Sequence, residues 1–269
     1  QPAGRDSAAR GGRELLHAAH EAERKTIWVR IQTESSVQLP LALYSERAFG
    51  DHATRDMTGL GIFYGTFVIM ILFNALIWLS TRDRGYGSFT FFLVTYGIFQ
   101  FAISVLLLQY VFPNSMWVAN VSLVFFGYLS LGTGLFYCLS YLPIEKQMPR
   151  YGKTLRVIAS LAIAGTLATF LLPYRLSIAF LILVGAVGVG MAVVAGVLSY
   201  RRGYEPAKIY LLGWGTFLTT VGIFILKTVA VLPSNFFTDS AWQIGTVFLI
   251  TFLALGLAER FRDIEEDSE

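Results

Sequence analysis

The stretch MTGLGIFYGTFVIMILFNALIWL, residues 57–79, decides the class of the fold. It carries no charged side chain, and about 20 apolar residues are enough to cross the hydrocarbon core of a bilayer as a helix. The whole chain shares this character, because 55% of its 269 residues are hydrophobic, only 14% are charged and the mean hydropathy is +0.58. Soluble domains carry about 25% charged residues. We therefore expect an integral membrane protein.

Runs of this kind recur along the chain, and prolines separate several of them. The predicted spans are residues 57–79, 89–111, 116–139, 157–172, 178–198, 209–232 and 241–257. Prolines between spans are typical of helix ends, because a proline inside a helix removes a hydrogen bond. The fourth run is the shortest. The sequence thus predicts an all-α membrane protein, a bundle of seven transmembrane helices.

The distribution of Lys and Arg predicts how this bundle is oriented. The first, third and fifth loops and the segment after the last span hold eleven such residues: Arg82, Arg84, Lys146, Arg150, Lys153, Arg156, Arg201, Arg202, Lys208, Arg260 and Arg262. The other three loops hold only Arg175. Positive loops stay in the cytoplasm. We expect the N-terminus outside and the C-terminus inside.

Residues 1–56 are expected to form an extracytoplasmic segment. In TIWVRIQ at 26–32, apolar side chains alternate with polar or aromatic ones, which indicates a strand, and QLPLALYS at 38–45 indicates a second. Two strands alone bury no face, so this segment is predicted to be the end of a β domain. The membrane domain then covers 57–258, and 259–269 would begin a cytoplasmic connector helix.

Few residues suit a metal or a cofactor. Cys138 is the single cysteine, which excludes an intrachain disulfide and a cysteine cluster. His17 and His20 could share a helix face as metal ligands, but a solvated helical face explains them as well. We expect no metal and no cofactor. The net charge of +3 is small and indicates no nucleic-acid partner.

Lys227 is the clearest ionisable residue inside a predicted span. Such residues are costly in a bilayer and mark functional sites. Lys227 could face a ligand in a cavity that opens outward, or its long stem could carry the ammonium group to the nearby interface. Gln109 and Asn120 are the other candidate ligand contacts, although polar groups in spans more often hydrogen-bond between helices.

Several function classes fit the sequence poorly. No acidic residue lies deep in a predicted span, which argues against a proton pump, and the last span lacks the lysine of a retinal protein. GAVGVG at 185–190 follows no strand, so phosphate binding is improbable. Close helix packing is the better interpretation of small-residue pairs such as Gly61/Gly65, Ala186/Gly190 and Ala192/Gly196. No nucleophile is paired with a base, so we expect no enzyme.

The last predicted helix carries apolar residues at heptad spacing across the membrane boundary: Ile250, Ala254, Leu257, Phe261 and Ile264. This seam predicts a parallel homodimer and a transmission role for Leu257, Arg260, Phe261 and Ile264. The alternative is a final helix that simply runs into charged residues. About two heptads are fewer than the three or four that identify a coiled coil.

The order of these features resembles the bacterial seven-transmembrane receptors with diverse intracellular signalling modules. The likeness rests on WVRIQTESSVQLPLALYSERAF at 28–49, LGIFYGTFVIMILFN at 60–74, RGYEPA at 202–207, LLGW at 211–214 and LALGLAER at 253–260. The resemblance implies a sensor in the bacterial inner membrane, with its N-terminus in the periplasm. Such a sensor relays a signal from an outer β domain, which binds an unknown small ligand, to a kinase or cyclase module. A small-solute transporter or channel and a structural subunit of a membrane complex are the alternatives.

Overall fold

A computed structural model describes residues 45–104, 106, 111, 115–229, 231–233 and 235–266. The chain divides into two compact units, Gln1–Phe49 and Gly50–Glu269, and nearly all described residues belong to the second. The predicted strands, His17 and His20 lie outside the described residues. The prediction of an outer β segment therefore stays a prediction.

The described part of the chain is all helical, as predicted, and contains no strand. Its helices are α2 (Glu46–Thr81), α3 (Arg84–Ile103), α4 (Met116–Tyr141), α5 (Ile144–Gln147), α6 (Pro149–Ala168), α7 (Tyr174–Arg201), α8 (Ala207–Thr228) and α9 (Phe236–Glu266). Six of them, all except α5 and α6, are long and apolar enough to cross a membrane. The all-α membrane bundle is thus confirmed.

Helix α6 differs from the predicted fourth span at 157–172. It begins at Pro149, where proline is favoured because the first helical N–H has no partner inside the helix. Its first turns carry Arg150, Lys153 and Arg156, which the sequence interpretation assigned to a loop. These charges lower the hydropathy of α6. Whether α6 is the seventh span therefore remains a prediction.

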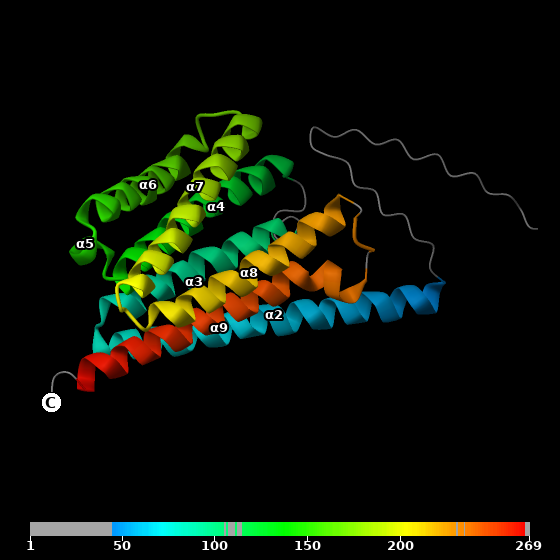
Figure 1. Cartoon of the computed structure of the whole chain (residues 1–269). Helices are drawn as coiled ribbons and strands as arrows, with labels where there is room; N and C mark the ends of the chain where they lie inside the picture. The colour runs from blue at the N-terminus through cyan, green and yellow to red at the C-terminus, as the bar shows by residue number, and fades with distance from the viewer. Residues whose placement is uncertain are drawn as a thin grey trace, which may run out of the picture. The chain divides into compact units, whose positions relative to one another are not determined.

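Five helices surround the centre of the bundle. Neighbours along the series α3, α4, α7, α8, α9 and back to α3 are in contact, so these helices form a closed ring. Helix α6 packs outside the ring against α4 and α7, and α2 packs outside it through aromatic contacts with α3. Figure 1 shows α4, α6 and α7 gathered on one side, and α3, α8 and α9 on the other.

Glycines allow close approach at particular crossings in this ring. A Cβ on Gly245 of α9 would lie 1.7 Å from Thr220 Oγ1 of α8. Of the predicted small-residue pairs, Ala192/Gly196 is confirmed, because a Cβ on Gly196 would lie 2.8 Å from the Tyr210 ring. The Gly61/Gly65 pair was wrong as a packing motif within this chain, since a Cβ at either position meets nothing within 4 Å, and the same holds at Gly190.

Tyrosine side chains tie the helices together through backbone carbonyls. Hydroxyl groups donate to carbonyl oxygens on another segment in these pairs: Tyr64 to Gln100, Tyr128 to Ser177, Tyr137 to Leu253, Tyr141 to Pro206, Tyr151 to Met191, Tyr204 to Tyr141 and Tyr210 to Ala192. A carbonyl oxygen has a second lone pair, so it can accept such a bond in addition to the one in its own helix.

Candidate functional site

Helix α9 makes polar contacts with neighbouring helices along its length, beginning with an ion pair. Lys227 Nζ, near the end of α8, lies 2.5 Å from Asp239 Oδ1 in the first turn of α9. The lysine side chain is 27% exposed and its ammonium group lies 5.9 Å from the centre of the Phe224 ring. Asn235 Oδ1 accepts hydrogen bonds from the N–H groups of Phe237 and Thr238, which caps α9. We call this end of the bundle the Lys227 end.

A buried polar network joins α9 to α3 further along. Trp242 Nε1 donates to Gln100 Oε1 over 2.9 Å, and Gln100 Nε2 donates to Thr246 Oγ1 over 3.2 Å. The hydroxyl groups of Tyr96 and Thr246 are also 3.2 Å apart. Gln100 is 2% exposed and Thr246 is fully buried. Because buried polar groups need partners, this network fixes how α9 sits against α3.

An aromatic column continues from this network through the interior. Its rings are Phe99, Tyr96, Phe92, Tyr137, Tyr141 and Tyr210, with successive centroids 5.3–6.3 Å apart and nearly parallel planes. Offset stacking of this kind stabilises neighbouring rings. The column therefore connects the polar network of α3 and α9 with the opposite end of α4 and the start of α8.

At that opposite end, Arg260 holds α9 against α3 and α4. Its Nη1 donates to the carbonyl oxygen of Ser140, 2.8 Å away in the last turn of α4, where a cation is favoured by the helix dipole. Gly85 of α3 lies close to the same nitrogen, since a Cβ added to this glycine would be 2.8 Å from it. Phe261 lies edge-on to Tyr86, with ring centres 6.0 Å apart. We call this the Arg260 end.

The heptad seam of α9 faces the core of the same chain. Ile250 is fully buried and Leu257 is 1% exposed, and both belong to the main hydrophobic core. The seam was predicted to pair with a second copy, and this was wrong for these two residues, since they are already covered by neighbouring helices. The side chain of Ile264 lies outside the described residues.

Two of the three predicted ligand contacts lie among the described residues. Lys227 is paired with Asp239, and Asn120 is exposed on the first turns of α4. Gln109 lies outside the described residues. The sequence interpretation missed the partner of Lys227, because Asp239 stands in what was read as a loop before the last span. It assigned no role to Gln100 or Trp242.

A cavity of 420 Å³ lies inside the five-helix ring. Its lining is almost entirely apolar and includes Tyr96, Phe217 and Trp242. Neither Lys227 nor Asn120 contributes to it, and none of the described residues that line it is acidic or basic. It therefore suits an apolar guest rather than an ion.

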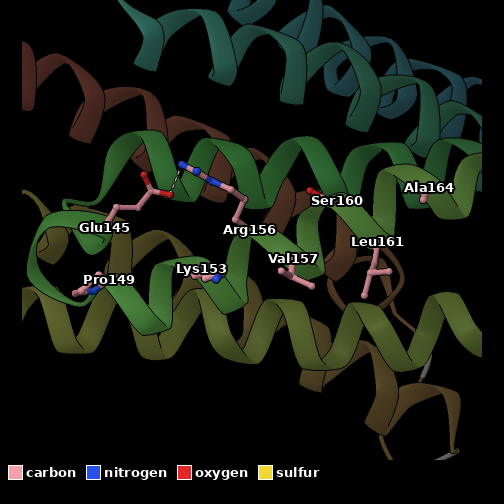
Figure 2. Close-up of a pocket in the computed structure, with 8 residues that line it drawn as sticks. All are labelled: Glu145, Pro149, Lys153, Arg156, Val157, Ser160, Leu161 and Ala164. Atoms are coloured by element: carbon pink, nitrogen blue, oxygen red, sulfur yellow. Dashed lines mark ion pairs between the residues drawn. The ribbon is translucent and has the colours of Figure 1, made fainter.

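A second hollow, of about 700 Å³, runs along the outside of α5 and α6 (Figure 2). Arg156 forms an ion pair with Glu145 at one end, and Lys153 lies beside them. Val157 and Leu161 continue the hollow along α6, and both are more than half exposed. This is an open groove with a charged end, and no helix of the described part covers it.

Comparison with known proteins gives one match. The family model described as 7TM diverse intracellular signalling matches residues 56–260. No curated protein and no solved structure matches the chain.

Proposed function

Because the chain belongs to the family of 7TM domains with diverse intracellular signalling, we propose that it relays a signal from outside the membrane to a cytoplasmic output module through α9. The family is one of membrane signalling domains and not a catalytic one, in line with the expectation of no enzyme. The finer proposal concerns direction and mechanism, namely that a stimulus at the Lys227 end changes the position of α9 at the Arg260 end.

One observation carries this proposal: α9 is a single unbroken helix, Phe236–Glu266, with specific polar contacts at both ends and in the middle. A rigid helix transmits displacement along its axis or rotation about it. The contacts of α9 lie on separate helices, with α8 at the Lys227 end, α3 in the middle and α4 at the Arg260 end. A ligand that favours one arrangement of these contacts over another would shift the population of α9 positions.

The experiment measures whether the two ends are coupled. Spin labels on Ala258→Cys of α9 and Lys208→Cys of α8, both exposed near the Arg260 end, report the distance between the two helices. Asp239→Asn removes the charge partner of Lys227. A partly exposed ion pair contributes about 0.2–1 kcal/mol, so we expect its loss to shift the ratio of two distance populations by roughly 1.4- to fivefold.

Two further variants make this test specific. Lys227→Asp combined with Asp239→Lys restores an ion pair with reversed charges, and we expect the distance distribution to return toward that of the wild type. Asp51→Asn, an exposed carboxylate on α2, is the matched control and should leave the distribution unchanged. Unchanged distances in Asp239→Asn, with the protein folded, would refute the coupling.

The orientation and the seventh span are part of the same proposal. We infer that α6 crosses the membrane, with the N-terminus in the periplasm, because the Lys and Arg residues cluster at alternate connections. An impermeant maleimide added outside intact cells should react with Arg175→Cys and not with Lys146→Cys or Lys208→Cys. Equal labelling of residues 146 and 175 would show that α6 does not cross.

Helix α9 is also the proposed route to a partner. A cytoplasmic kinase or cyclase module would receive the displaced end of α9. A homodimer would have to use faces of α9 other than Ile250 and Leu257, which are covered within the chain. Native mass spectrometry of the purified protein tests the dimer, and loss of the dimer in Phe261→Glu would support a contact through the end of α9.

A further inference from the structure

The cavity inside the five-helix ring is not part of the proposed relay, and its geometry indicates a ligand. Tyr137 and Tyr210 belong to its lining, and Tyr210 also donates a hydrogen bond to the carbonyl of Ala192. Its volume of 420 Å³ falls in the usual range of about 300–1,000 Å³ for ligand sites. Aromatic and aliphatic walls of this kind recognise apolar guests.

The opening of the cavity shows where a guest would enter. Helices α7 and α8 touch near their connecting loop, around Gly196 and Tyr210, and diverge from there (Figure 1). Two lining residues of α7 beyond this contact, Ile182 and Ala186, are exposed. In a membrane-spanning chain, an exposed apolar face in the middle of a span adjoins hydrocarbon. These lining residues of α7 therefore face the acyl chains of the bilayer.

Water is a poor occupant of this space. Most polar groups of the lining have partners within the protein, since Trp242 and Tyr96 take part in the network with Gln100 and Thr246, and Ser130 Oγ donates to the carbonyl of Gly127. Trp214 Nε1 is the exception among the described lining residues, because it is buried without a hydrogen-bond partner, and a single donor is too few to hold a water. Water in a cavity needs two to four polar partners. An acyl chain needs none, and it gains dispersion contacts with the rings of the lining.

We propose that this cavity holds one acyl chain of a membrane phospholipid, which enters sideways between α7 and α8. Occupancy holds α7 apart from α8 on the open side of the ring. This site goes beyond the proposed relay, and its test measures binding alone, so either idea can fail without the other.

The matched variants use two glycines of α7. A Cβ on Gly185 has Leu131 Cδ2, 4.0 Å away, as its only neighbour within that distance, and both residues line the cavity. Gly185→Leu therefore fills part of the cavity without displacing backbone. Gly190 meets nothing within 4 Å and does not line the cavity, so Gly190→Leu makes the same chemical change outside it.

The probe is a phosphatidylcholine with brominated acyl chains, reconstituted with the protein in nanodiscs. Bromine quenches nearby indoles, and Trp214 and Trp242 both line the cavity. In a background with Phe in place of the other three tryptophans, Trp28, Trp78 and Trp117, we expect strong quenching in the parent and in Gly190→Leu. Gly185→Leu should lose most of this quenching while its melting temperature stays equal or rises.

A second measurement avoids the tryptophan background. Native mass spectrometry of the detergent-purified chain should show one tightly held phospholipid in the wild type and in Gly190→Leu, and none in folded Gly185→Leu. Equal quenching and equal lipid retention in all three proteins would overturn the proposal. Retention of a small apolar molecule instead of a phospholipid would overturn the assignment of the guest to the bilayer.

Discussion

Replacing Gln100 by Leu tests the buried network that joins α3 to α9. The substitution keeps a side chain of similar size but removes two hydrogen bonds, the one accepted from Trp242 Nε1 and the one donated to Thr246 Oγ1. It leaves the indole N–H of Trp242 without its acceptor inside the bundle. The expected result is a loss of stability, because an apolar surrounding offers that N–H no replacement.

The size of this loss follows from the two bonds. A hydrogen bond between helices in a membrane contributes about 0.6 kcal/mol on average and up to about 1.7 kcal/mol. Two such bonds give about 1.2 kcal/mol. For a domain of this size, each kcal/mol shifts the melting temperature by about 2–4 °C. We therefore expect Gln100→Leu to melt about 2–5 °C below the wild type.

The assay is thermal unfolding of the detergent-purified protein, with Asn120→Leu as the control. Asn120 is an exposed amide on α4, so the same type of change there should alter stability by less than about 0.5 kcal/mol. Trp242→Phe alone and combined with Gln100→Leu completes a double-mutant cycle. A coupling energy of about 0.6 kcal/mol between the two positions is expected. Additive effects, or a melting temperature of Gln100→Leu within about 1 °C of the wild type, would refute the reasoning.

The remaining predictions concern one crossing, one thiol and one charge. Gly245→Ala should destabilise the protein by about 1–3 kcal/mol, because its Cβ would collide with Thr220. A Cβ at Gly222 has no neighbouring atom within 4 Å, so Gly222→Ala should be neutral or slightly stabilising. Equal melting temperatures of the two variants would contradict this. Cys138 is 1% exposed, so its thiol should react with a maleimide only after unfolding, and fast labelling of the native protein would count against the described core. Lys227→Met should lower the free energy of unfolding by at most about 1 kcal/mol. This loss of stability relative to the wild type should shrink as the salt concentration is raised.

The helical class could be predicted from composition, because uninterrupted apolar runs have few other uses in a protein chain. The ends of helices were harder, and α6 shows why. Arg150, Lys153 and Arg156 are typical of a cytoplasmic loop, yet helix formation depends on backbone hydrogen bonds that charged side chains also permit. A sequence profile therefore locates the apolar part of a helix better than its start.

Most contacts between helices could not be predicted from the sequence. Gln100 and Trp242 are far apart in the chain, and no local pattern pairs them. The seam of α9 illustrates a second limit. Apolar residues spaced three and four apart mark the buried face of any helix, whether the partner is a second copy or the same chain. Only the packing shows that Ile250 and Leu257 face the core of their own bundle.

The hydrogen bonds of the tyrosines have a consequence for how this bundle tolerates change. In the seven bonds from tyrosine hydroxyl groups to carbonyl oxygens described above, the acceptor is a main-chain oxygen, which every amino acid possesses. Replacing the side chain of Leu253 or Ala192 therefore removes no acceptor, whereas replacing Tyr137 or Tyr210 by Phe removes the bond itself. In a mutational scan of these interfaces, the loss of stability from a broken hydrogen bond should therefore appear only at the tyrosine positions. The side chains of the helix that supplies the carbonyl oxygen can be changed without losing that hydrogen bond.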